Sequence, residues 1–110
     1  MVPKDSQLRR GVLELAILTL LGARPHYGGA IVSNLSSRQG LESGAGTVYP
    51  LLTRLSNSGY VSTTWQESPS GPPRKYYQLT PQGTKHLAHL SQTWSDLVSS
   101  MTDLMREGNP

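Results

Sequence analysis

The first fifth of the chain carries apolar residues at the spacing of an α-helix that is buried on two sides. One stripe consists of Leu8, Val12, Leu15 and Leu18, and a second stripe consists of Leu13, Ile17, Leu20 and Leu21. The pattern predicts a helix from Gln7 to about Ala23, which Ser6 can cap and Arg24-Pro25 ends. Because such a helix is covered on both sides, we expect one side to pack on its own domain and the other on a partner.

A second, shorter helix is predicted from about Tyr27 to Ser37. Apolar residues recur there at a spacing of four, from Tyr27 through Ile31 to Leu35. The paired glycines at its start, Gly28 and Gly29, weaken it by about 1 kcal/mol each relative to alanine.

A third helix is predicted from about Ala45 to Ser58. Its apolar residues fall at i, i+3, i+4 and i+7, and they are Val48, Leu51, Leu52 and Leu55. Gly59 follows as the expected left-handed C-terminal cap. Pro50 lies beyond the first turn, where its ring removes a backbone hydrogen bond, so we expect an irregular helix start.

The segment from Tyr60 to Leu79 is typical of a β-hairpin. Alternation around Val61, Thr63 and Trp65 predicts a half-buried strand, and a turn rich in Ser, Pro and Gly leads into a return strand. Neighbouring residues in a strand point to opposite faces, so we expect only one of Tyr76 and Tyr77 to lie in the core.

A long helix is predicted after the hairpin. Thr80-Pro81 has the pattern of an N-cap followed by a proline at the first helical position. The helix then carries an apolar seam at spacings of three and four, formed by Leu87, Leu90, Trp94, Leu97, Met101 and Leu104. No neighbouring segment of the sequence remains to cover this seam, so we expect a second copy of the chain to do so.

The order of helix, helix, helix, hairpin and long helix defines the expected fold. It predicts a mainly α protein with a small β-hairpin (α+β). A short helix followed by a hairpin is the arrangement found in a winged helix-turn-helix. We assign residues 1–80 to a DNA-binding domain of this kind and residues 81–110 to a C-terminal dimerisation helix.

Length, charge and composition add only a few constraints on the class of protein. The 110 residues suffice for one ordinary domain, and ten Lys and Arg against seven Asp and Glu give a net charge of +3. The basic surplus lies in residues 1–79, which suits a body that binds a polyanion. The absence of cysteine excludes disulfides and thiolate chemistry. The longest apolar stretch is too short for a membrane span, so we expect a cytoplasmic protein that does not bind membranes.

The sequence gives little evidence for a catalytic site or a metal site. His86 and His89 share a helical face, but no third ligand is evident, and we expect these residues and His26 to be solvated. Nothing arranges Ser, His and Asp as a triad, and no glycine-rich phosphate loop follows a strand. We therefore expect neither an enzyme nor a cofactor or metal site.

Two groups of polar residues are candidates for DNA contacts. Those on the outward face and flanks of the third helix are Thr47, Tyr49, Thr53, Arg54 and Asn57, and those on the return strand of the hairpin are Arg74, Lys75 and Tyr76. Hydroxyl, amide and guanidinium groups suit base edges and phosphates. For the first group, spacing alone favours a solvated helix face, but the hairpin that follows the helix and the resemblance described below favour DNA contacts. For the second group, the alternative is an ordinary charged hairpin tip.

Three motifs resemble the PadR family of bacterial winged-helix transcriptional regulators. They are LRRGVLELAILTLL from Leu8, GTVYPLLTRLSNSGYV from Gly46 and GPPRKYYQLTPQG from Gly71. A single C-terminal helix resembles the short subclass. Family members commonly read His-Gly-Tyr where this chain reads His26-Tyr27-Gly28-Gly29, and Ser-Glu where it has Gly44-Ala45. These departures bear on where both helices start and on whether Tyr27 contacts DNA.

The resemblance implies a homodimer that binds an inverted-repeat operator, usually as a repressor, and that a small, often aromatic molecule releases. It also implies that Trp94 stacks on this effector at the dimer interface, although the default interpretation of a tryptophan at this spacing is a core residue of a coiled-coil contact. The other residues that would line the effector site are Leu90, Leu97, Val98 and Met101 in the last helix and Gln7, Gly11 and Glu14 in the first. The alternative interpretation is a winged-helix protein-interaction module that does not bind DNA.

Overall fold

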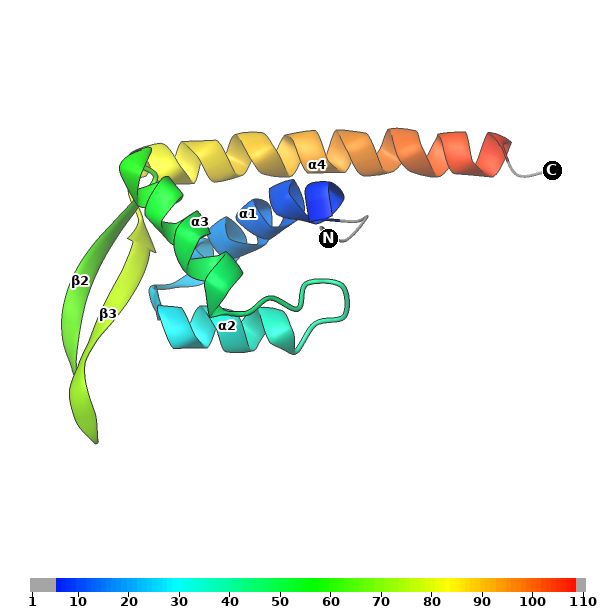
Figure 1. Ribbon diagram of the computed structural model, residues 1–110. Coiled ribbons are helices and arrows are strands. Elements are labelled where there is room, and N and C mark those ends of the chain that lie inside the picture. Colours follow the sequence, from blue (N-terminus) through cyan, green and yellow to red (C-terminus); the bar gives the residue numbers. More distant parts are fainter. Residues whose placement is uncertain (1–5, 109–110) are drawn as a thin grey trace.

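The computed structural model describes residues 6–108, which form four helices and a three-stranded antiparallel sheet (Figure 1). Along the chain the elements are α1 (Ser6–Ala23), β1 (His26–Tyr27), α2 (Gly28–Ser36), α3 (Ala45–Asn57), β2 (Val61–Ser68), β3 (Gly71–Leu79) and α4 (Pro81–Glu107). This α+β arrangement is a winged helix-turn-helix with a long C-terminal helix, which confirms the predicted fold class. The structure describes the backbone of Ser6 but not its side chain, so the predicted capping role of Ser6 stays a prediction.

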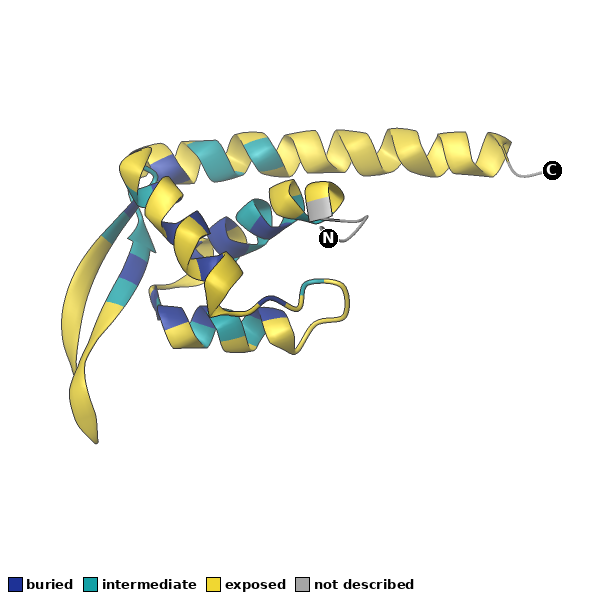
Figure 2. Ribbon diagram, viewed as in Figure 1, coloured by how far each residue is buried: buried dark blue, intermediate teal, exposed yellow. Residues whose placement is uncertain are grey.

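The body is a packed cluster of α1, α2 and α3 (Figure 2). Its most completely buried side chains include Ile17 and Leu18 of α1, Ile31 of α2, and Leu52 and Leu55 of α3. These are the residues whose helical spacing predicted the three helices, so burial of their apolar faces accounts for the arrangement.

The start of α2 differs from the prediction. Tyr27 does not begin the helix but lies in the short strand β1, where it pairs with Tyr76 of β3, and His26 pairs with Tyr77. The helix begins at Gly28, and Tyr27 precedes it in an extended conformation. Pairing with β3 therefore holds residues 26 and 27 in an extended conformation, and α2 starts one residue later than predicted.

Helix α3 confirms the predicted cap but not the irregular start. The helix runs without interruption from Ala45 across Pro50, and Gly59 follows it with a φ of +82°. Pro50 points outward on the exposed side, so the missing backbone hydrogen bond does not leave a gap in the core. Ser58 is the C-cap rather than the last helical residue.

The hairpin extends beyond the body, with β3 between β1 and β2 (Figures 1 and 2). Val61 is the buried residue of β2, whereas Trp65 is 68% exposed, so the prediction of a half-buried strand is wrong beyond the first residues. The reason is that nothing packs on the outer part of the hairpin within residues 6–108. As predicted, one tyrosine of the pair is in the core: Tyr77 is buried, whereas Tyr76 is partly exposed.

Helix α4 starts at the base of the hairpin and passes over α1 (Figure 1). Thr80 is its N-cap, as predicted, and its Oγ1 accepts a hydrogen bond from the Gly83 amide at 3.0 Å. Leu87 and Leu90 pack on the core, but the apolar residues from Trp94 onward are exposed (Figure 2). Only the first part of the predicted seam is therefore covered within one chain.

The expectation of solvated histidines holds for one of the three. His89 is exposed, but His26 is buried, and its Nδ1 donates to the carbonyl oxygen of Arg24 at 2.8 Å. His86 is partly buried because its ring stacks on Tyr60, with 4.0 Å between the ring centroids. Both of these side chains have structural partners.

Candidate nucleic-acid interface

The outward face of α3 presents the polar side chains that the sequence pattern placed opposite the apolar stripe. Thr47, Tyr49, Thr53, Arg54 and Asn57 are all exposed or partly exposed, whereas the apolar residues of the same helix are buried. The Thr53 hydroxyl donates to the carbonyl oxygen of Tyr49 at 3.0 Å, so its hydrogen is used within the helix and its oxygen is left as an acceptor. The helix therefore presents a row of polar groups that suits contact with a DNA groove.

Tyr49 packs its ring against the start of α2 while remaining 41% exposed. A Cβ on Gly28 would overlap the Tyr49 hydroxyl and ring carbons, so glycine is required for this close approach. Burial raises the pKa of the neighbouring Tyr77 phenol above its ordinary value, and the nearby Tyr49 adds to the increase. Both features tie the centre of α3 to α2 and β3.

Arg54 bridges α3 and α1. Its guanidinium lies 3.1 Å from the carboxylate of Glu14, and the Arg54 side chain is 52% exposed. A pair this exposed contributes at most about 1 kcal/mol, so the contact orients Arg54 more than it stabilises the fold.

The cations of the hairpin are held by aromatic rings. The Arg74 guanidinium lies over the ring of Tyr27 at 4.3 Å from the centroid, and the Tyr27 ring meets Tyr76 edge-on at 5.6 Å. Lys75, on the opposite face of β3, lies 5.7 Å from the Tyr77 centroid. Tyr27 thus supports the position of Arg74, a role that sequence reasoning missed because Tyr27 was assigned to a helix.

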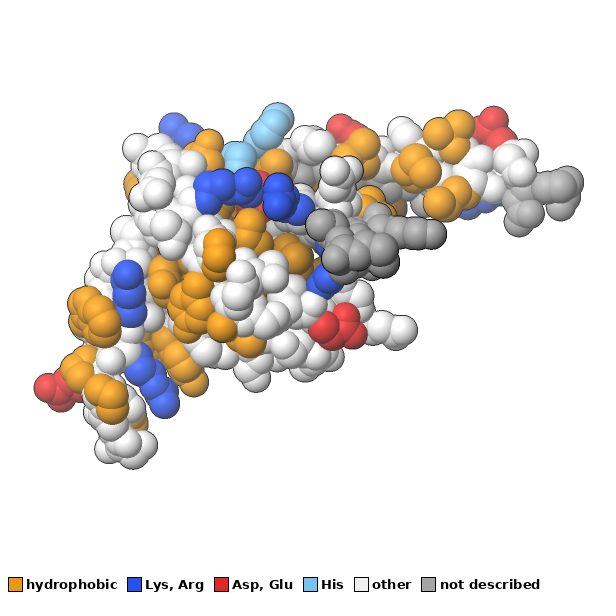
Figure 3. Space-filling model, viewed as in Figure 1, with side chains coloured by type: hydrophobic (Ala, Val, Ile, Leu, Met, Phe, Trp, Pro, Cys, Tyr) orange, Lys and Arg blue, Asp and Glu red, His pale blue; other side chains and the backbone are white. Residues whose placement is uncertain are grey.

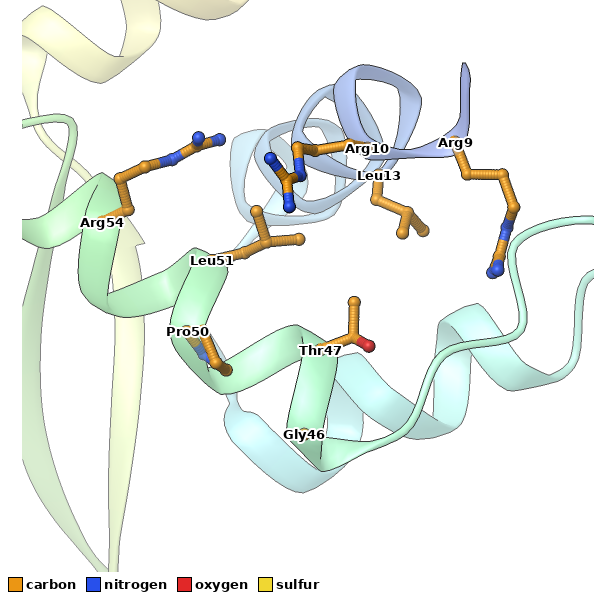
Figure 4. Close-up of a pocket in the computed structure, with 8 residues that line it drawn as sticks. All are labelled: Arg9, Arg10, Leu13, Gly46, Thr47, Pro50, Leu51 and Arg54. Atoms are coloured by element: carbon orange, nitrogen blue, oxygen red, sulfur yellow. The ribbon is translucent and has the colours of Figure 1, made fainter. Parts of the chain in front are cut away.

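Basic side chains occupy separate regions of the face shown in Figure 3, which is called the basic face below. In this view Lys and Arg side chains lie along the hairpin and also over the region where α1 and α3 meet. The second group includes arginines of α1 that the sequence did not single out. Arg9, Arg10 and Arg54 line a groove of about 510 Å³ together with Leu13, Gly46, Thr47, Pro50 and Leu51 (Figure 4).

A second groove, of about 640 Å³, lies between α1 and α4. It includes all but one of the predicted effector-site residues, namely Gln7, Gly11, Leu90, Trp94, Leu97, Val98 and Met101. Glu14 does not line the groove, because its carboxylate faces Arg54. The sequence did not indicate four further lining residues, Leu8, Val12, Leu15 and Thr93.

Two further observations concern only residues 6–108. Within that range, no three His, Asp or Glu side chains are placed to hold a metal ion. None of the helices in the same range combines the length and apolar character needed to cross a membrane.

The body, wing and long C-terminal helix define the class of winged helix-turn-helix proteins, and comparisons with known proteins give the family. Residues 17–89 match the model of the transcriptional regulator PadR-like family. The chain belongs to this family, whose members regulate transcription rather than catalyse reactions.

Several relatives resemble the chain over most of its length. A PadR-like transcription factor from Bacteroides fragilis is 42% identical, with a TM-score of 0.76 over 91% of this chain and 96% of the other. A PadR-like transcriptional regulator from Bacillus cereus is 31% identical, with a TM-score of 0.83 over 91% and 97% of the two chains. An uncharacterised protein from Lysinibacillus sphaericus is 30% identical over 94% of this chain and 95% of its own length.

Proposed function

We propose that this protein is a homodimeric, sequence-specific DNA-binding repressor that acts in the cytoplasm on an inverted-repeat operator. The observation that carries the proposal is the combination of an exposed polar face on α3 with a cationic wing. Membership of a family of transcriptional regulators supports it. In this arrangement α3 contacts base edges in the major groove, and Arg74 and Lys75 contact the flanking backbone.

The apolar seam of α4 supports the homodimer. Large side chains stay exposed along the second half of this 27-residue helix, and they are Trp94, Leu97, Val98, Met101, Leu104 and Met105. A second copy can cover them through the same seam, as in a two-fold symmetric helix pair. The pair then presents two α3 helices and two wings to half-sites about one helical turn apart.

The groove between α1 and α4 supports an effector site. Its volume of about 640 Å³ falls in the range of small-molecule sites, and its lining is almost entirely apolar. Trp94 belongs both to this groove and to the seam of α4, so the effector site lies at the dimer interface, where a planar aromatic molecule stacks on the exposed Trp94 ring between the two copies. A ligand bound there releases DNA only if it binds more tightly to a dimer in which the separation of the two winged helix-turn-helix bodies fits the operator less well.

The DNA-binding part is tested by titrating fluorescent mixed-sequence duplex DNA at several salt concentrations. We expect binding that weakens with salt. In Arg74→Ala the salt dependence should be less steep, by about 0.9 in log–log slope for each phosphate that the variant no longer neutralises. Arg106→Gln, which removes a charge at the far end of α4, is the matched control. Absence of any salt-sensitive binding would favour a protein-interaction module instead.

The effector part is tested by tryptophan fluorescence. In a Trp65→Phe background, Trp94 is the remaining tryptophan, because the chain has two. We expect a planar aromatic dye to quench its emission and to lower operator affinity. Quenching without any change in DNA affinity would show a groove that binds aromatic molecules but does not regulate.

A further inference from the structure

The groove between α1 and α3 extends the basic face beyond the proposed DNA contacts (Figure 4). Thr47 and Arg54 belong both to the groove and to those contacts, whereas Arg9 and Arg10 of α1 take no part in them. Arg10 and Arg54 point toward each other across the groove with Leu51 between them, and Leu13 lies between Arg10 and Arg9. Three guanidinium groups share this groove, and the eight residues that line it include no acid. Glu14, the carboxylate partner of Arg54, lies outside the lining, and within residues 6–108 no carboxylate pairs with Arg9 or Arg10, so their charges attract an anion into the groove.

The three arginines have different environments. Arg9 is committed to the loop before α3: it donates to the carbonyl oxygens of Gly40 and Glu42 and to the Ser43 hydroxyl. These acceptors are uncharged, so they hold the Arg9 side chain in place without neutralising it. Arg54 is paired with Glu14. Within residues 6–108, Arg10 is exposed and has no ion-pair partner.

The start of α3 adds donors to the same groove. Gly44 precedes the helix without a side-chain cap, and the first turn contains no acidic residue. The first amides of a helix lack a partner four residues back; here the Thr47 amide donates to the Gly44 carbonyl oxygen at 3.1 Å, so Gly46 is the groove-lining residue that offers its amide to a ligand. A Cβ on Gly44 or Gly46 would meet no atom within 4 Å, so a ligand can approach this backbone closely.

We infer that this groove is a phosphate-binding site, with Arg10 as its principal cation and the Thr47 hydroxyl and the first turn of α3 as supporting donors. Arg9 is a positioning residue, since it fixes the loop that sets the start of α3. A guanidinium binds a phosphate through two parallel hydrogen bonds, and helix N-termini favour the same anion. The inference rests on the proposed function: the occupant is a backbone phosphate of the duplex that α3 reads, contacted on the side of α3 away from the wing.

The test compares the full-length protein with Arg10→Gln in the salt-dependent DNA titration. We expect the log–log slope to decrease by about 0.9 per chain, the contribution of one phosphate. Arg10→Lys, which keeps the charge, should retain most of the slope, and Arg106→Gln should leave it unchanged. Arg74→Ala in the same assay separates the two ideas: if it reduces the slope and Arg10→Gln does not, the wing contact stands and the groove contact is overturned.

Nuclear magnetic resonance distinguishes the source of the phosphate. We expect the Gly46 and Thr47 amide signals to shift on adding duplex DNA, and to shift much less in Arg10→Gln. If inorganic phosphate alone shifts them while the DNA salt slope of Arg10→Gln stays at the wild-type value, the phosphate site is supported but its occupant is a free anion. An unchanged slope together with no shift from either ligand overturns the inference.

Discussion

The guanidinium of Arg74, on the wing, lies 4.3 Å from the centroid of the Tyr27 ring, in the short strand that precedes α2. The Tyr27 ring also meets the ring of Tyr76 edge-on, so this one ring contacts two residues of β3. The contact links the helix-turn-helix body to its wing, and it makes the position of Arg74 depend on a residue that is far from it in the sequence.

This relationship predicts a positioning role for Tyr27. An exposed cation–π contact is worth about 0.5–1 kcal/mol, so Tyr27→Ala should weaken DNA binding about two- to fivefold. Tyr27→Phe keeps the ring and should bind nearly as well as the wild type. The salt slope should stay the same in both variants, because Arg74 itself remains. Equal affinity of Tyr27→Ala and wild type would show that Arg74 needs no such support.

The close approach of Tyr49 to α2 predicts that Gly28 does not tolerate a side chain. Gly28→Ala places a methyl group against the Tyr49 ring, and overpacking of this kind costs about 1–3 kcal/mol. Gly46→Ala is the control, because its Cβ would enter open space. Urea denaturation should show a lower free energy of unfolding for the first variant and little change for the second.

The start of α4 is similarly constrained. A Cβ on Gly83 would collide with the backbone carbonyl of Tyr60, which cannot rotate away as a side chain can. We expect Gly83→Ala to lower the free energy of unfolding by about 2 kcal/mol, whereas alanine at the exposed neighbour Gln82 should be nearly neutral. A stable Gly83→Ala protein would mean that α4 can tilt, and small-angle scattering would detect the changed shape.

Tyr77 predicts the behaviour of the fold in alkali. Its pKa is raised above the ordinary value of 10.0, chiefly by burial, so the folded state holds the phenolic proton more tightly than the unfolded state does. The Tyr77 contribution to stability is complete below about pH 10 and is lost as the pH rises through the folded pKa. Tyr77→Phe should therefore lose less stability between pH 9 and about pH 11 than the wild type, as measured by denaturant titration. Identical pH profiles would contradict this.

Much of the fold could be predicted from the sequence because its signals are periodic. The stripe from Val48 to Leu55 and the cap at Gly59 define α3, and Thr80-Pro81 defines the start of α4. Strand β1 escaped prediction because it is two residues long and exists only through pairing with β3. The spacing from Tyr27 to Leu35 imitated an additional helical turn.

The candidate site could be predicted only where it lies on one element. The outward residues of α3 follow from the position of its apolar stripe, and Arg74 follows from the hairpin pattern. Contacts between distant segments leave no such trace: Arg54 meets Glu14 across forty positions, and Arg10 meets the groove beside α3 through the packing of two helices. Likewise, the alternation around Trp65 predicts a strand but does not predict whether another segment packs on that strand.

The central claim is that two chains join through α4 and bind one duplex together. Sedimentation velocity of the protein at micromolar concentration, alone and with a stoichiometric fluorescent operator-length duplex in dilute buffer, tests it most directly. We expect a species of two chains without DNA and a complex of two chains per duplex. A single-chain species that leaves the duplex sedimenting as free DNA would contradict it.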